Sequence, residues 1–234
     1  MQTLLVDPFG THRPTLVELI KNTTGNILEC GCGNSSTVLI KDLIKGTDRK
    51  LVSLESNEEW LSKFKHMEDE NHKMYFINCG NNDDDETGNA WVEFIKTNEY
   101  IQNLSFEVCF IDQSPWTART KTLHYLKEKS KYIIVHDVDY FPGHKKWGTI
   151  KNRLHTNNNS LFKYEMDFSD VAKNYKVYYP PEHSFAGPTG PSTLLCSSIV
   201  NKKEFESMTK KINVEQYYKY YEPIGRPHFW AKET

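Results

Sequence analysis

Residues 27 to 36 read Ile-Leu-Glu-Cys-Gly-Cys-Gly-Asn-Ser-Ser, and this segment constrains the fold more than any other part of the chain. An apolar run ends in the acid Glu29, and two glycines follow at alternate positions, Gly31 and Gly33. Glycine allows a positive φ and leaves no Cβ in the way of a ligand. The segment therefore predicts a strand followed by a tight turn, with a nucleotide-like ligand lying against the backbone of the turn.

The residues after the glycines can begin a helix. Ser35 or Ser36 can cap it, with the free N–H groups of the first turn pointing at the ligand. The carboxylate of Glu29 suits a cationic ligand better than a phosphate. A phosphate-binding P-loop is excluded, because no Gly-Lys-Ser/Thr follows the glycines.

A second motif lies 26 residues after Glu29, where the apolar segment 50–55 ends in Glu55. In nucleotide-binding α/β sheets, an acid at the end of the second strand accepts hydrogen bonds from ribose hydroxyls. The two motifs in this order predict a ligand that contains adenosine, and the alternative is an ordinary α/β turn. Adenine is then expected near Cys79, Gly80 and Asn81, at the end of the next strand.

Composition excludes several classes of function. A chain of 234 residues with a net charge of −2 is expected to form one domain and not to bind nucleic acid or a membrane surface. No apolar stretch is long enough to span a bilayer, and no signal peptide is evident. The five cysteines include no Cys-x-x-Cys pair, so we expect a reduced, cytoplasmic protein.

Apolar runs of strand length alternate with amphipathic segments over about the first 160 residues. This alternation is typical of a mostly parallel sheet covered by helices on both faces. We expect strands at 27–30, 50–55, 74–78, 106–112 and 131–137. We expect helices at 13–22, 35–46, 57–69, 90–103, 117–130 and 146–156. Three further strands, without helices between them, predict an antiparallel hairpin that closes the sheet; they lie at 161–167, 175–179 and 193–200.

Ionisable residues end two of the predicted central strands. Asp112 ends one, and His136, Asp137 and Asp139 end the next. Ligands of an open α/β sheet bind beyond the carboxyl ends of its strands, so these groups are expected in one crevice. They could hold a divalent metal through oxygen ligands or form a carboxylate–histidine general base. Alternatively, the two later acids cap the following loop through Asx-turns.

Two further segments can contribute to the crevice. His12 and Arg13 begin the first predicted helix and could reach a carboxylate of the ligand. The acidic run 81–86 lacks the ligand spacing of an EF-hand, which favours a solvated loop over a calcium site.

These residues resemble those of class I S-adenosylmethionine-dependent methyltransferases. Glu29-Cys-Gly-Cys-Gly33 resembles the glycine-rich motif of that family, and Glu55 resembles its ribose-binding acid. The resemblance covers about 25–200 and implies a Rossmann-like, doubly wound, mostly parallel seven-stranded sheet with a C-terminal antiparallel hairpin. It implies S-adenosylmethionine as cofactor, with contacts from Glu29, Gly31, Gly33, Ser35, Glu55, Ser56, Gly80 and Asp112.

A narrower resemblance is to plant glucuronoxylan O-methyltransferases and to glycan methyltransferases of algal viruses. Its residues are the strand end Ile111-Asp112-Gln-Ser-Pro115, then Arg119, and the strand end Val135-His136-Asp137-Val138-Asp139. Two departures are expected: no Golgi membrane anchor before the domain, and a different loop at 180–191. The resemblance implies an O-methyltransferase that acts on a sugar hydroxyl of a glycan. The alternatives are methylation of a catechol-like small molecule and a cofactor-binding scaffold without catalysis.

A sugar hydroxyl is a poor nucleophile, so such an enzyme must align it and remove its proton. We expect Asp112, His136 and Asp137 to be catalytic. A Mg or Mn ion, which would lower the pKa of the hydroxyl, is expected on Asp112, Asp137 and Asp139. The histidine–carboxylate base is the alternative to the metal.

The expected domain organisation is one methyltransferase domain over 1–234. It comprises an N-terminal helix region (1–24), a cofactor-binding core (25–200) and a C-terminal aromatic helix and tail (201–234). The Pro/Gly-rich loop 180–191 and the C-terminal aromatic residues are expected on the acceptor side of the crevice, and the oligomeric state is left open.

Overall fold

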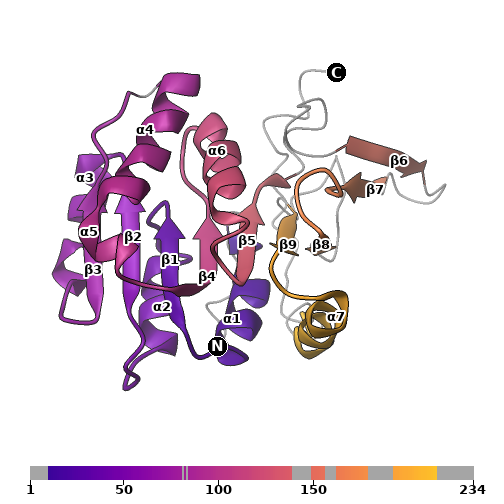
Figure 1. The fold of residues 1–234 in the computed structure, drawn as a ribbon, viewed down its shortest axis with the longest axis horizontal. Helices are drawn as coiled ribbons and strands as arrows, with labels where there is room; N and C mark the ends of the chain where they lie inside the picture. Colours follow the sequence, from indigo (N-terminus) through magenta and orange to yellow (C-terminus); the bar gives the residue numbers. More distant parts are fainter. Residues whose placement is uncertain are drawn as a thin grey trace, which may run out of the picture.

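The computed structural model describes residues 10–80, 82, 84–138, 149–155, 162–178 and 192–214. Its centre is a seven-stranded sheet in the order β3-β2-β1-β4-β5-β9-β8 (Figure 1). Strands β1 to β5 pair in parallel, and β9 is antiparallel to both β5 and β8. The bounds are β1 (Asn26–Cys30), β2 (Leu51–Glu55), β3 (His72–Phe76), β4 (Phe106–Ile111), β5 (Tyr132–His136), β8 (Asn174–Tyr178) and β9 (Thr193–Ser197). The predicted mostly parallel seven-stranded sheet with a C-terminal antiparallel hairpin is confirmed.

Helices cover both faces of this sheet. On one face lie α1 (Arg13–Lys21), α2 (Thr37–Leu43) and α7 (Lys202–Lys211). On the other lie α4 (Asp85–Thr97), α5 (Glu99–Gln102) and α6 (Trp116–Leu126). Strand β4 shows how one apolar run serves both layers, since Cys109 and Ile111 enter one core while Val108 and Phe110 enter the other. A strand buried on both faces needs such a continuous apolar run.

Helices α1, α2 and α6 confirm the helices predicted at 13–22, 35–46 and 117–130, with somewhat shorter bounds. A single helix at 57–69 is wrong, because α3 (Glu58–Ser62) is followed by a separate 3₁₀ turn, η3 (Lys65–Met67). The carboxylate of Asp69 accepts the N–H groups of Asn71 and His72, both at 2.8 Å, and so turns the chain into β3.

The helix predicted at 90–103 begins earlier and is divided in two. Asp84 caps α4 by accepting the N–H of Thr87 at 2.9 Å, so part of the acidic run starts a helix and is not a loop. Asn98 ends α4 and caps α5 by accepting the N–H of Ile101 at 3.1 Å. Acids in the first turn of α4 are stabilised by the helix dipole.

A helix over 146–156 is also wrong, because residues 149–155 form a strand. This strand, β6 (Thr149–His155), pairs antiparallel with β7 (Phe162–Asp167) in a separate two-stranded sheet. The register shifts between Ile150 and Asn152, which adds one residue and interrupts the alternation of the strand. Because of this extra residue, apolar residues of the strand fall at the spacing of a helix. Strand β7 lies within the strand predicted at 161–167, and it pairs with β6 and does not join the main sheet.

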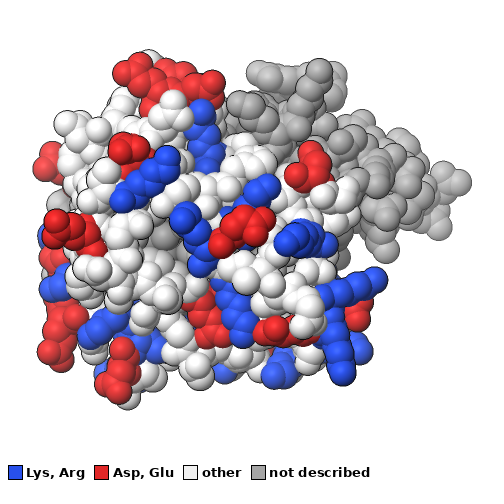
Figure 2. Space-filling view, in the orientation of Figure 1, with Lys and Arg blue, Asp and Glu red and all other residues white. Residues whose placement is uncertain are grey.

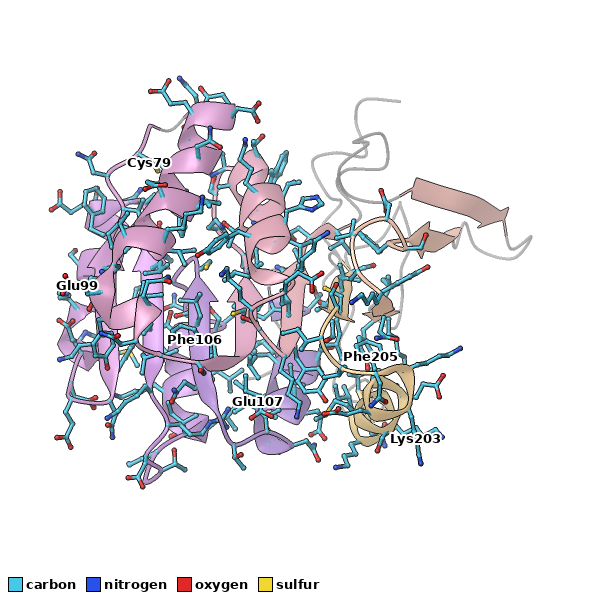
Figure 3. All side chains as sticks on the ribbon, in the orientation of Figure 1. Cys79, Glu99, Phe106, Glu107, Lys203 and Phe205 are labelled. Carbon is cyan, nitrogen blue, oxygen red and sulfur yellow. The ribbon has the colours of Figure 1, made fainter. Side chains whose placement is uncertain are left out.

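The carboxyl ends of the five parallel strands meet at one edge of the sheet. Figure 3 labels Phe106 and Glu107 at the start of β4, and Cys79 beyond the end of β3, toward opposite edges. The side chain of Glu107 closes the edge where β4 starts by accepting the N–H of Gly25 at 2.6 Å. The turn after β1, Glu55, Asp112 and His136 therefore all belong to the carboxyl edge.

Charges of both signs are interspersed over the described part of the face drawn in Figure 2. No helix in the described ranges combines the length and the apolar composition that crossing a bilayer would require. The predicted absence of nucleic-acid and membrane partners stays a prediction.

Gly31 fixes the distance between the ends of β1 and β4. Its φ is +95°, and its N–H donates to the carbonyl of Leu54 at 2.8 Å. A Cβ built on Gly31 would lie 2.7 Å from backbone atoms of both Asp112 and Gln113. The side chain of any other residue at this position would therefore clash with the backbone after β4, whether or not a ligand is bound.

We predict that Gly31→Ala destabilises the protein by roughly 2–4 kcal/mol, because a strained φ and a backbone clash add together. Gly46→Ala is the matched control: Gly46 also has a positive φ, +76°, but nothing lies within 4 Å of its added Cβ. The control should lose only about 1–2 kcal/mol. Urea unfolding measures both variants, and equal losses would contradict the close contact at Gly31.

Candidate active site

The turn after β1 is held from β2 and α3. The carboxylate of Glu55 accepts the N–H of Cys32 at 3.0 Å through Oε2. Its Oε1 accepts the N–H groups of Ser56 and Asn57 at 2.8 and 2.9 Å. The indole of Trp60 donates to the carbonyl of Cys32 at 2.7 Å. Glu55 therefore lies beside the turn; burial raises its pKa, and these backbone donors oppose that rise.

Glu29 lies beneath the turn and has no exposed surface. Thr37 donates its hydroxyl to both carboxylate oxygens at 3.0 Å, and Ser53 donates to one at 2.6 Å. Burial raises the pKa of Glu29 to about 7, and hydroxyl donors including Ser36 lower it in part. The carboxylate thus joins β1, β2 and α2, and its predicted contact with a cationic ligand stays a prediction.

The N–H groups around the turn are largely used within the protein. The N–H of Gly33 donates to the hydroxyl of Thr37 at 2.9 Å, and the carbonyl of Gly33 accepts the N–H groups of Ser36 and Thr37. Ser36 makes no side-chain cap, so that alternative of the capping prediction is wrong; its hydroxyl bonds to Glu29. A Cβ on Gly33 would meet nothing closer than the hydroxyl of Ser36 at 3.5 Å, so it would make only ordinary van der Waals contacts within the protein.

Cys79 and Gly80 follow β3 at the same edge of the sheet. Gly80 is exposed, and its carbonyl accepts the hydroxyl of Thr87 at 3.4 Å. Cys79 is half-buried, and its thiol interacts with the side chains of Ser56 and Trp91. The expected adenine contact at this position stays a prediction.

A guanidinium joins the two acids at the ends of β4 and β5. Arg119, on α6, lies 3.0 Å from Oδ1 of Asp112 and 2.8 Å from Oδ2 of Asp137. Asp137 has a φ of +61°, in the left-handed region. Burial raises the pKa of Asp137, but the charges of His136 and Arg119 outweigh this effect and leave it lowered.

His136 lies against the same acids. Its Nδ1 is 3.3 Å from Oδ1 of Asp112 and 3.4 Å from Oδ1 of Asp137, and its Nε2 is 2.9 Å from the hydroxyl of Thr11. Burial lowers the pKa of His136, but the two carboxylates outweigh this effect, so the pKa is raised. The three predicted catalytic residues therefore lie together.

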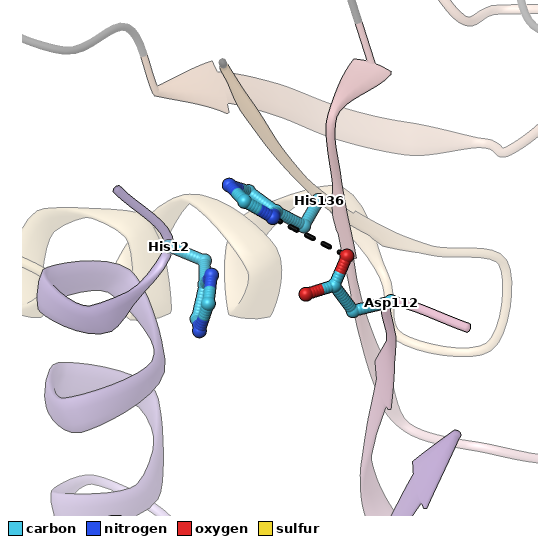
Figure 4. Close-up of side chains that lie close together, drawn as sticks. All are labelled: His12, Asp112 and His136. Atoms are coloured by element: carbon cyan, nitrogen blue, oxygen red, sulfur yellow. Dashed lines mark hydrogen bonds and ion pairs between the residues drawn. The ribbon is translucent and has the colours of Figure 1, made fainter. Parts of the chain in front are cut away.

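His12 completes the group from the start of α1 (Figure 4). Its ring lies 4.4 Å from the ring of His136 and 4.7 Å from that of Phe110, measured between centroids. Its Nε2 is 3.3 Å from the carbonyl of Ser35. Burial and the nearby charge of His136 lower the pKa of His12 to about 3, so the ring is neutral.

The predicted metal site on Asp112, Asp137 and Asp139 is only partly described. Arg119 already supplies a positive charge between the first two acids, and Asp139 lies outside the described residues. The loop 180–191 and the aromatic residues near the C-terminus also lie outside them, so their place on the acceptor side stays a prediction.

Two sets of contacts in the candidate site were not predicted from the sequence. One is the pairing of Arg119 with both acids, and the other is the approach of Thr11 and His12 to His136. The Pro-x-x-x-Arg spacing after Asp112 is the one signal that could have indicated the first of these sets. The second depends on where α1 packs, which no local pattern reveals.

No family model matches this sequence, and a search of curated proteins found no match. Among solved structures, a spermidine synthase from Thermotoga maritima is similar with a TM-score of 0.50 and 12% identity, over 93% of this chain and 67% of that chain. The N-terminal domain of EvdMO1 with SAH bound has a TM-score of 0.46 and 13% identity, over 84% of this chain and 83% of that chain. At these identities the likeness to the spermidine synthase concerns the backbone fold alone.

Proposed function

We propose that the protein is an S-adenosylmethionine-dependent O-methyltransferase and that its acceptor is a sugar hydroxyl of a glycan. The observation that carries the proposal is the arrangement of three strand ends. The glycine turn follows β1, Glu55 ends β2 and Asp112 follows β4, and these three strands are neighbours in the sheet. The resemblance of the turn to class I S-adenosylmethionine-dependent methyltransferases supports the choice of cofactor. The resemblance of the strand end at 135–139 to glycan methyltransferases supports the choice of acceptor.

We place the cofactor beyond the carboxyl ends of β1 and β4. The order of the strands reverses at this point, and the following helices diverge, α2 to one face and α6 to the other. Ligands of doubly wound sheets bind at such a switch point. A cofactor there would have its ribose beside Glu55 and would lie against the backbone of the turn at Gly33. The end of the cofactor that carries the methyl group would lie near Asp112.

Asp112 is the member of the acidic group best placed to touch an acceptor. Its side chain is 23% exposed, whereas that of His136 is 2% exposed. Asp137 and Arg119 would hold Asp112 in place through the shared guanidinium. Methyl transfer needs an acceptor oxygen aligned with the methyl group and relieved of its proton, and a fixed carboxylate can do both.

We predict that Glu55→Ala weakens binding of S-adenosylhomocysteine by about 1–3 kcal/mol, because a charged acceptor of the ribose hydroxyls is lost. Isothermal titration calorimetry measures the loss directly. Unchanged affinity would contradict the assignment of Glu55 to the ribose.

Trp60→Phe provides the matched control for that variant. It removes the indole N–H that donates to the carbonyl of Cys32 and leaves the Glu55 carboxylate in place. If Trp60→Phe weakens binding as much as Glu55→Ala, then Glu55 supports the turn and does not contact the ribose.

We predict that Asp112→Asn and Asp137→Asn each reduce turnover by roughly 10²–10⁴-fold, as expected when a general base or its orientation is lost. Asparagine keeps the shape of the side chain and tolerates the φ of +61° at position 137. The assay uses labelled S-adenosylmethionine with a glycan panel and catechol as the competing acceptor class. Affinity for S-adenosylhomocysteine should change far less in both variants.

Glu58→Gln, on the exposed start of α3, serves as the control and should keep full turnover. Turnover close to wild type in both aspartate variants would remove the acidic group from the mechanism. Methylation of catechol without methylation of any glycan would replace the proposed acceptor class but not the cofactor.

A further inference from the structure

Three side chains from separate segments converge at the carboxyl edge of the sheet. His12 precedes α1, Asp112 follows β4 and His136 ends β5. One nitrogen or oxygen of each lies within 4.8 Å of one atom of each of the others (Figure 4). Both histidines are almost fully buried, at 1% and 2% exposure. We propose that His12, Asp112 and His136 together bind one divalent transition-metal ion.

The first reason is an unpartnered nitrogen on His12. Its Nε2 faces the carbonyl of Ser35 at 3.3 Å, and a carbonyl only accepts, so Nε2 carries the proton. The lone pair of the neutral ring then lies on Nδ1, which is buried and has no hydrogen-bond partner among the described residues. A buried acceptor without a donor is destabilising, and a metal ion would satisfy it.

The second reason is that both rings are held from outside the cluster. The Nε2 atom of His136 contacts the hydroxyl of Thr11 at 2.9 Å, just as the Nε2 of His12 contacts Ser35. Ligating histidines characteristically use one ring nitrogen for the metal and give the other to an outer oxygen partner. Here each ring has its outer partner on Nε2, which leaves Nδ1 for the metal.

The third reason is spacing. Ligand atoms around a metal at about 2.1 Å lie about 3.0–3.4 Å apart. Nδ1 of His136 and Oδ1 of Asp112 already lie 3.3 Å apart. The ligand atoms of all three residues lie within 4.8 Å of one another, so His12 must approach the other two to complete the set.

The donors also indicate which class of ion is preferred. Two imidazoles and one carboxylate suit zinc, iron and related transition ions, whereas magnesium prefers oxygen ligands. Asp112, Asp137 and Arg119 together carry one net negative charge, and a divalent ion would replace the proton that the two carboxylates favour on His136. The proposal rests on this donor set, on the unpartnered Nδ1 of His12 and on the outer contacts of the two rings. It shares Asp112 with the proposed function but does not require methyl transfer.

The test is metal binding by the full chain, with zinc as the probe. Chelator-treated protein is dialysed against zinc or magnesium, and the bound metal is counted by atomic emission. We expect one zinc ion per chain, and no magnesium at concentrations that saturate with zinc. His12→Gln should weaken zinc binding by about 100-fold or more, since even an outer partner of a ligand contributes about 10–100-fold.

His66→Gln is the matched control, because His66 is exposed on η3, far along the chain from the cluster, and should leave zinc binding unchanged. Thermal unfolding confirms that each variant is folded; if His12→Gln is not, Asp112→Asn replaces it with the same expectation. Absence of stoichiometric zinc in the wild type, or equal zinc binding by the wild type and a folded His12→Gln variant, would overturn the proposal. Equal binding of magnesium and zinc would contradict the proposal that the two imidazole nitrogens are metal ligands. Affinity for S-adenosylhomocysteine is measured separately on the same samples, so a failure of the proposed function is recognised independently.

Discussion

The buried guanidinium of Arg119 holds together the carboxyl ends of β4 and β5. Its Nε donates to the carbonyl of Gln113 at 2.6 Å, and its Nη1 donates to the carbonyl of His136 at 3.0 Å. Nη1 also pairs with the carboxylate of Asp137, and Nη2 pairs with that of Asp112. A charge that is only 5% exposed is tolerated when it is paired and fully hydrogen-bonded. Lysine could not replace it, because one ammonium cannot reach acceptors in so many directions.

The turn after β1 and the acids after β4 are linked through the same backbone. Gly31 packs against the peptide between Asp112 and Gln113, and Arg119 bonds to the carbonyl groups of both residues. A shift of the turn after β1 would therefore be transmitted to the acids at the end of β4. Because cores are densely packed, such a shift would move the whole contact and would not be absorbed locally. The proposed cofactor and acceptor positions are consequently held at a fixed separation.

Much of the framework could be predicted from the sequence, because it depends on local patterns. Apolar runs ending in Glu55 and Asp112 place those acids at the carboxyl edge of a parallel sheet, whatever the details of packing. The irregular strand β6 could not be predicted, since a bulge after Ile150 gives it the apolar spacing of a helix. The contact of His12 with His136 could not be predicted either, because it joins residues that are distant in the chain and depends on how α1 packs.

The burial of the other thiols makes Cys79 a site for selective chemical labelling. Four of the five cysteines are buried, and Cys79 alone is partly accessible. Burial raises the pKa of the Cys79 thiol, so alkylation there would be slow but confined to one position. Because this position follows β3 beside Ser56, a fluorophore attached to it would test whether the proposed cofactor binds there, without any engineered cysteine.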